Sequence, residues 1–145
     1  MNSLRPIVIV EDSLADMELM LESIKGHHLA NPIDTCRDGA EALDYLYRRG
    51  LWAARGGLEP IVVFLDLKMP KVDGMEVLRI VKSDPKLKTI PVVILTSSHE
   101  ESDLVKSYKL GANAYVVKPV GFAEFAAAVE ELGAFWAVLN EPPPL

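Results

Sequence analysis

Four apolar runs of the sequence each end in polar side chains that can take part in chemistry. The runs end in Glu11-Asp12, Asp66, Thr96 and Lys118. Three carboxylates held close together repel one another, and burial raises their pKa values further. A bound divalent cation relieves that repulsion, and hard oxygen ligands with room for water suit Mg²⁺. We therefore expect Glu11, Asp12 and Asp66 to form a Mg²⁺ site.

The other two strand-end groups suit phosphoryl transfer. The Lys118 ammonium adds positive charge, and the Thr96 hydroxyl adds a hydrogen-bond donor. Together with a metal ion, they place positive charge and a hydrogen-bond donor around a carboxylate, and these stabilise a transferring phosphoryl group. A carboxylate can itself be the nucleophile and form an aspartyl phosphate. Asp66, at the end of the strongest apolar run, is the candidate nucleophile.

Five strand-like segments must position these residues, and each is followed by a helix-like segment. Continuous apolar strands are what a parallel sheet needs when helices cover both of its faces. Right-handed crossovers then give a doubly wound α/β sheet, whose ligand site lies beyond the carboxyl ends of the strands. The expected strands are 6–10, 33–36, 61–65, 92–95 and 114–117, and the expected helices are 13–25, from 38 onward, 73–81, 98–110 and 122–139.

The expected helices carry their own start and packing signals. Ser13 with Asp16 resembles a capping box, and Ser98 with Glu101 is expected to cap the fourth helix. Apolar residues of the last helix recur every three or four positions, and its end, with the proline tail, is long enough to contact a partner. The side chains expected to face the core in the first two helices are Leu14, Met17, Leu21, Ile24, Leu43, Leu46 and Tyr47.

Composition narrows the class of protein. The chain has 145 residues, the usual size of one domain, and half of them are hydrophobic. It has no apolar run long enough to cross a membrane, and its N-terminus lacks the features of a signal peptide. The net charge of −6 argues against general nucleic-acid binding. We expect a cytoplasmic protein in which the single Cys36 is a free structural residue.

Four motifs carry a resemblance to a known family. They are VEDS (10–13), FLDLKMPKVDG (64–74), ILTSS (94–98) and AYVVKP (114–119). In this order, each at a strand end, they resemble a receiver domain of the two-component response regulator family over nearly the whole chain. The resemblance implies a flavodoxin-like fold, with five parallel strands in the order 2-1-3-4-5 and five helices. It also implies a phosphoacceptor signalling protein, not an enzyme, that assists its own phosphorylation and dephosphorylation.

The resemblance implies roles for the acidic residues. Asp66 matches the phosphoacceptor of the family. Asp12 matches the direct Mg²⁺ ligand of the acidic pair, and Glu11 matches the acid that acts mostly through water. Lys68 falls where the family binds the metal through a backbone carbonyl, so its side chain is free to vary.

The resemblance also implies roles for residues of the last two strands. Lys118 matches the lysine that binds the phosphoryl group. Thr96 matches the switch hydroxyl, and Tyr115 matches the aromatic switch that follows it inward. The Lys118–Pro119 bond matches one that is cis in the family, and prolyl bonds are those for which cis is cheap.

The expected organisation is a single receiver domain at 1–140, a Pro-rich tail at 141–145 and no output domain. A histidine kinase would supply the phosphoryl group. The protein would then signal through altered protein contacts or act as a phosphorelay intermediate. The loop near Trp52, the segment KSDPKLKTIPVVILTSS and the Phe135-Trp136 pair resemble single-domain regulators paired with bacterial phytochrome kinases. This implies a homodimer through the face of the fourth helix, fifth strand and last helix, or through the C-terminal segment.

Three other functions fit the pattern less well. A phosphohydrolase with an Asp nucleophile places a general acid two residues further on, where this chain has Lys68. A nucleotide-binding domain needs a Gly-rich phosphate loop, whereas the first turn here, VEDSLAD, carries acids. A degenerate receiver that only binds partners would lack a required residue, and none is missing.

Overall fold

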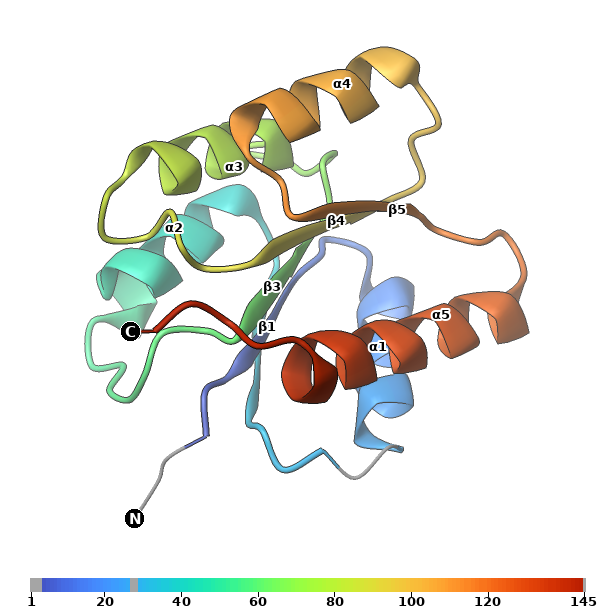
Figure 1. The fold of residues 1–145 in the computed structure, drawn as a ribbon, viewed down its shortest axis with the longest axis horizontal. Coiled ribbons are helices and arrows are strands. Elements are labelled where there is room, and N and C mark those ends of the chain that lie inside the picture. The colour runs from blue at the N-terminus through green and yellow to red at the C-terminus, as the bar shows by residue number, and fades with distance from the viewer. Residues whose placement is uncertain (1–3, 27–28, 145) are drawn as a thin grey trace.

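The computed structural model describes residues 4–26 and 29–144 as one central sheet flanked by helices (Figure 1). The five strands are parallel and lie in the order β2-β1-β3-β4-β5. The expected doubly wound sheet and its strand order are thereby confirmed. The strands are β1 (Ile7–Val10), β2 (Ile33–Cys36), β3 (Val62–Leu65), β4 (Val92–Thr96) and β5 (Ala114–Val117).

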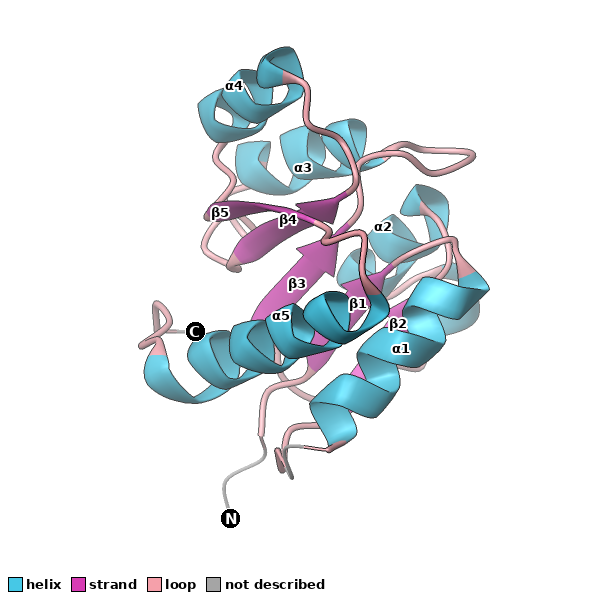
Figure 2. Cartoon of the chain, turned by 90° about the vertical axis from the view of Figure 1, so that its right-hand side faces the viewer, coloured by secondary structure: helices cyan, strands magenta, loops and turns pink. Residues whose placement is uncertain are grey.

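Five α-helices cover the two faces of the sheet. Figure 2 shows α1 and α5 side by side over one face, with α2, α3 and α4 over the other. The last α-helix ends earlier than expected, and the chain continues through a π-helical turn, η2 (Phe135–Leu139). The helices are α1 (Leu14–Lys25), α2 (Gly39–Tyr47), α3 (Gly74–Ser83), α4 (Glu101–Leu110) and α5 (Phe122–Ala134), and a short 3₁₀ turn, η1 (Gly50–Trp52), follows α2.

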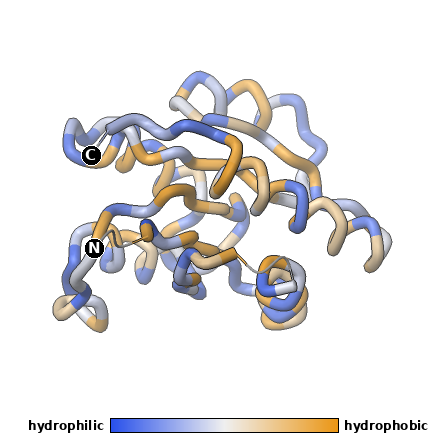
Figure 3. The backbone as a smooth tube through the Cα atoms, turned by 60° about the horizontal axis from the view of Figure 1, so that its bottom comes forward, coloured by the Kyte–Doolittle hydropathy of each residue, from blue (hydrophilic) through white to orange (hydrophobic). Residues whose placement is uncertain are grey.

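The central strands β1 and β3 are apolar throughout because they pack against helices on both faces of the sheet. In β3, Val63 and Leu65 pack with the residues of the α2 and α3 side. Val62 and Phe64, which alternate with them, pack with the residues of the α1 and α5 side. The hydropathy colouring of Figure 3 shows hydrophobic stretches running through the interior. The sheet is thus a rigid platform for whatever follows its strand ends.

Two of the helix side chains expected to face the core do not lie there. In α2 the fully buried aromatic residue is Tyr45, whereas Tyr47 is 38% exposed and donates a hydrogen bond to Asp84. The apolar residues of this segment fall on two faces of a helix, so their spacing alone does not show which face is buried. Tyr47 is the last residue of α2, which ends at the left-handed Arg48. Leu14, expected in the core, is the first residue of α1 and is exposed.

Cys36 is buried at the end of β2, as expected for a free structural cysteine. Burial, with the nearby charges of Glu41 and Asp34, raises the pKa of its thiol far above the usual range. The thiol is therefore protonated and unreactive. Within the described ranges, the helices are too short or too polar to cross a lipid bilayer.

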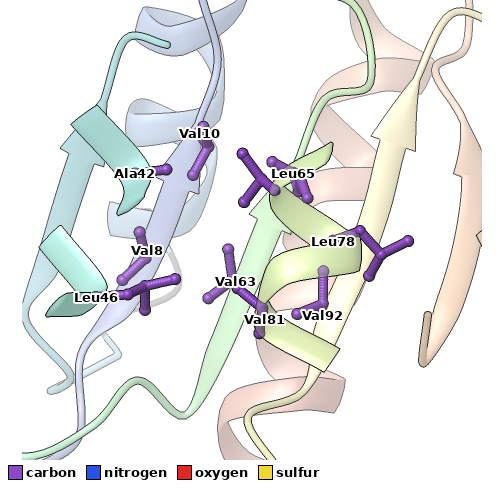
Figure 4. A pocket seen from close by; sticks show the side chains of 10 residues that line it. Val8, Val10, Ala42, Leu46, Val63, Leu65, Leu78, Val81 and Val92 are labelled. Atoms are coloured by element: carbon purple, nitrogen blue, oxygen red, sulfur yellow. The ribbon is translucent and has the colours of Figure 1, made fainter. Parts of the chain in front are cut away.

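A small cavity of about 10 Å³ lies between the sheet and helices α2 and α3. Figure 4 shows the aliphatic side chains that enclose it. A space of this size holds about one water molecule, but water also needs polar partners, so we expect the cavity to be dry. Its lining residues are Val8, Val10, Ala42, Leu46, Val63, Leu65, Val77, Leu78, Val81 and Val92.

Packing around this cavity predicts the effect of enlarging it. Leu78 is 0% exposed and Leu51 is 92% exposed. Leu78→Ala is expected to lower the free energy of unfolding by about 2–5 kcal/mol, because the space that it leaves cannot fully collapse. The same change at Leu51 is expected to stay within about 0.5 kcal/mol of wild type. Urea denaturation of both variants measures this, and equal effects would contradict the packing described.

Candidate functional site

Backbone hydrogen bonds align the ends of neighbouring strands. The amide of Asp66 donates to the carbonyl of Val10 over 3.1 Å, so the residue after β3 lies beside Glu11, the residue after β1. The amide of Lys118 donates to the carbonyl of Thr96 over 2.7 Å, which links the ends of β5 and β4. All four polar strand ends therefore lie at one edge of the sheet, as the sequence predicts.

Three carboxylates form a compact cluster at this edge. One oxygen from each of Glu11, Asp12 and Asp66 lies within 4.8 Å of the others. Glu11 and Asp66 are buried, whereas Asp12 faces solvent. Burial, reinforced by the charge of Asp66 and opposed by Lys118, raises the pKa of Glu11 to about 7.

This donor set fits a hard divalent cation. Such a cation prefers carboxylate oxygens, and it needs open positions for water, which the exposed side of Asp12 leaves. A cation at this place would also offset the charge of Asp66, which adds to the larger effect of burial in raising the pKa of Glu11. The cluster is a divalent-cation site.

The ammonium group of Lys118 lies among the carboxylates. Its Nζ is 2.5 Å from Glu11 Oε1, 2.9 Å from Asp16 Oδ2 and 3.3 Å from Asp66 Oδ2. The Lys118 side chain is 9% exposed. Burial alone would lower its pKa, but its hydrogen bonds to Glu11 and Asp16 and the neighbouring negative charges outweigh burial, and its pKa is raised. Lys118 therefore stays charged.

The chain turns back sharply after Asp66. The Lys68 amide points at Asp66 Oδ1 over 3.4 Å, while the Lys68 side chain is exposed. The Gly74 amide donates to the carbonyl of Leu67 over 2.8 Å. A Cβ atom at Gly74 would lie 2.0 Å from the carbonyl oxygen of Asp66, so no larger residue fits there. The α3 N-terminus can approach the Asp66 backbone only because position 74 is glycine.

Thr96 and Tyr115 meet at the backbone of Ser98. Thr96 is buried, and its Oγ1 accepts from the Ser98 amide over 3.3 Å. The Tyr115 hydroxyl donates to the Ser98 carbonyl over 3.2 Å, and burial raises the pKa of this phenol. The Ser98 hydroxyl donates to Asp103 in the first turn of α4 over 2.6 Å. One residue thus connects the end of β4, β5 and α4.

Ser98 does not cap α4 in the expected way. The residue that precedes the helix is Glu100, and its side chain makes no capping hydrogen bond. Ser98 Oγ instead accepts over 3.3 Å from the amide of Glu100, the residue immediately before the helix begins at Glu101. The Ser98 hydroxyl is held instead by its hydrogen bond to Asp103, which links the loop to the first turn of α4.

The expected cis bond before Pro119 is not observed. The Lys118–Pro119 bond is trans, as are the other peptide bonds of the described residues. The trans form of a prolyl bond is intrinsically favoured by about 0.5–1 kcal/mol. Lys118 reaches Glu11 and Asp66 with this bond in place. The arrangement of charges therefore does not require the cis form.

Sequence reasoning missed one member of the site, Asp16. It was expected to act in the helix cap, and its amide does donate to Ser13 Oγ over 3.3 Å. Its carboxylate, however, contacts Lys118. The available signal was position, because an acid in the first helical turn after β1 faces the same sheet edge as Glu11.

Comparison with known proteins identifies the family. The family model of the response regulator receiver domain matches residues 7–130. The chain belongs to this family. As a receiver of the response regulators, it is a phosphoacceptor signalling protein.

Individual relatives support the same assignment. The receiver is 38% identical over 135 residues to the response regulator Rcp1 of Synechocystis sp., which covers 93% of this chain and 90% of Rcp1. The structure of Mn²⁺-bound Rcp1 matches with a TM-score of 0.90, covering 97% of this chain and 99% of that one. That relative binds a divalent cation, which agrees with the acid cluster of this receiver.

Two phytochrome response regulators also match over most of the receiver. The phosphorylated cyanobacterial regulator RcpA is 37% identical, with a TM-score of 0.91, and the match covers 98% of this chain and 100% of that one. The bacteriophytochrome response regulator RtBRR is 59% identical, with a TM-score of 0.77, and the match covers 97% of this chain and 85% of that one.

The close approach at Gly74 leads to a prediction for the receiver. Gly74→Ala places a methyl group against the Asp66 backbone. We therefore expect the free energy of unfolding to fall by about 1–3 kcal/mol or more. We also expect weaker Mn²⁺ binding, because Asp66 must move. Gly56→Ala is the control, since a Cβ there meets nothing within 4 Å. Urea denaturation and calorimetric Mn²⁺ titration measure both effects, and a Gly74→Ala protein that matches the control would contradict the geometry.

Proposed function

We propose that Asp66 accepts a phosphoryl group from a histidine kinase in a Mg²⁺-dependent reaction. The observation that carries the proposal is the contact of the Lys118 ammonium with Asp66 Oδ2, 3.3 Å apart, inside the acid cluster. A carboxylate oxygen of Asp66 attacks the phosphorus of the phosphohistidine. The phosphorus–nitrogen bond breaks, its electron pair stays on the imidazole, and an acyl phosphate remains on Asp66.

The neighbouring residues have separate tasks in this proposal. Asp12 and Asp66, with the backbone carbonyl of Lys68, would hold the Mg²⁺ ion, and Glu11 would act on it mostly through water. The ion supplies positive charge that offsets the negative charge on the transferring group. Lys118 turns its ammonium toward the phosphoryl oxygens, as its contact with Asp66 allows.

The kinase that we propose as phosphodonor is a bacterial phytochrome. RcpA and RtBRR are described as phytochrome response regulators, and both match this chain over nearly its whole length. The α2–β3 loop near Trp52 and the Phe135-Trp136 pair support the same partner, because they resemble such regulators in sequence.

The phosphoacceptor role predicts a simple result by intact mass. After incubation with Mg²⁺ and a small acyl phosphate, the wild-type chain should gain one phosphoryl group. Asp66→Asn should gain none, because it lacks the nucleophilic oxygen. Asp44→Asn is the matched control on α2, where Asp44 pairs with Arg49 away from the cluster. An unmodified wild type, or a phosphoryl group that survives Asp66→Asn, would overturn the proposal.

We further propose that Thr96 and Tyr115 carry the phosphorylation state outward. The phosphoryl group draws the Thr96 hydroxyl inward, and Thr96 Oγ1 then loses its contact with the Ser98 amide. Tyr115, whose hydroxyl contacts the Ser98 carbonyl, moves with it. Since the Ser98 hydroxyl is bonded to Asp103, the change reaches α4.

The face formed by α4, β5 and α5, with the C-terminal segment, is the proposed dimer surface. β5 is an edge strand of the sheet and is half-buried, unlike the buried β1 and β3. Apolar side chains are exposed on the neighbouring elements, so a second copy of the chain would cover them. They are Leu104, Val105 and Tyr108 on α4 and Phe135, Val138 and Leu139 at the C-terminal end.

The dimer surface can be tested with single charges. Val105→Glu and Val138→Glu should each raise the dimer dissociation constant about tenfold or more, because an unpaired charge would be buried. Leu51→Glu is the control, since Leu51 is exposed on the far α2–β3 loop. Sedimentation equilibrium measures the constants. A monomeric wild type, or dimers that tolerate both charges, would contradict this surface.

A further inference from the structure

Asp16 is a third carboxylate on Lys118 that the metal cluster does not include. Its Oδ2 lies 2.9 Å from Lys118 Nζ, nearer than the 3.3 Å of Asp66 Oδ2. Among the residues that the structure describes, the cation cluster consists of Glu11, Asp12 and Asp66. Asp16 therefore acts on the ammonium group, and its removal leaves every candidate metal ligand in place.

The ammonium group of Lys118 has no spare donor. An ammonium has three N–H groups, and it makes three hydrogen bonds here, to Glu11, Asp16 and Asp66. A phosphoryl group on Asp66 brings several strong acceptor oxygens close to the same ammonium. For Lys118 to make more than one contact with them, it must give up one of its present partners.

Asp16 is the partner that can be given up at least cost. Its side chain is 32% exposed, whereas that of Glu11 is 2% exposed. A carboxylate released into water regains its hydration, while a buried one does not. Asp16 also lies in the first turn of α1, where the helix N-terminus stabilises its negative charge without Lys118.

We propose that Asp16 restrains Lys118 in the unphosphorylated receiver, and that its carboxylate competes with the phosphoryl group for the Lys118 ammonium. This inference rests on the proposed function, since it concerns the regulation of the same site. Asp16 is a positioning residue that acts through Lys118. Its hydrogen bond holds the ammonium toward α1, and the bond breaks when Asp66 is phosphorylated.

The competition predicts the direction of an equilibrium. Asp16→Asn replaces a charged acceptor with a neutral one of the same size, so the ammonium is freer to contact a phosphoryl group. Beryllofluoride, which mimics a phosphoryl group on a carboxylate, should bind about three- to tenfold more tightly to Asp16→Asn, as expected for loss of a partly exposed ion pair. Fluorine NMR at saturating Mg²⁺ measures this affinity, and calorimetric titration checks Mg²⁺ saturation in each variant.

A control and a second background separate this effect from general electrostatics. Glu18→Gln makes the same charge change at an exposed position of α1 and should leave the affinity within about twofold of wild type. In a Lys118→Gln background, Asp16→Asn should have no effect, because the ammonium is gone. An effect that persists in that background would mean that Asp16 does not act through Lys118, and would overturn the proposal.

The possible outcomes distinguish this inference from the proposed function. If wild type fails to take a phosphoryl group on Asp66, the proposed function fails. If wild type is phosphorylated but Asp16→Asn binds beryllofluoride no more tightly, the restraint alone is wrong. If Lys118→Gln binds too little beryllofluoride to measure, the rate of phosphorylation by a small acyl phosphate tests the restraint instead. Asp16→Asn must then raise this rate about threefold or more over wild type, and Glu18→Gln must leave it unchanged.

Discussion

The contact of one buried ammonium with three carboxylates is the interaction on which the site depends. Lys118 follows β5, Glu11 follows β1 and Asp66 follows β3, while Asp16 comes from the first turn of α1. Each contact thus ties together parts of the chain that are distant in sequence. The parallel register of the sheet makes this meeting possible, because it brings the strand ends to one edge.

The same interaction explains why the site is prepared for a cation and for a phosphoryl group. Lys118 offsets one charge, whereas four carboxylates lie around it when Asp12 is included. Burial is the larger cause of the raised pKa of Glu11, and this surplus of negative charge raises it further. A divalent cation lowers that surplus, and this makes the approach of a negatively charged phosphoryl donor less unfavourable. We therefore expect metal binding and phosphorylation to be coupled through charge.

Much of the fold could be predicted because it rests on local signals. The apolar run of β3 and the cap at Ser13 are local, and both are found in the structure. The edge at which Asp66 lies follows from the parallel topology. The burial of Tyr45 in place of Tyr47 could not be predicted, because α2 has apolar residues on two of its faces. Tertiary packing determines which face is buried.

The finer connections of the site depend on tertiary contacts. Asp16 satisfied a helix-cap pattern, so only its position in the first turn after β1 could have indicated its longer-range contact with Lys118. Ser98 likewise looked like a helix cap, whereas it joins Thr96, Tyr115 and Asp103. Short polar side chains can bond locally or across the fold, and spacing alone does not separate the two.

The dependence of phosphorylation on a divalent cation tests the coupling of charge at this site most directly. The yield of phosphorylated chain from a small acyl phosphate should be measured as a function of Mg²⁺ concentration. The sample without Mg²⁺ should contain a chelator that removes residual cations. We predict no phosphorylation without the cation, and half-maximal phosphorylation at the Mg²⁺ dissociation constant found by calorimetry. Equal phosphorylation of Asp66 in the chelator would contradict the account.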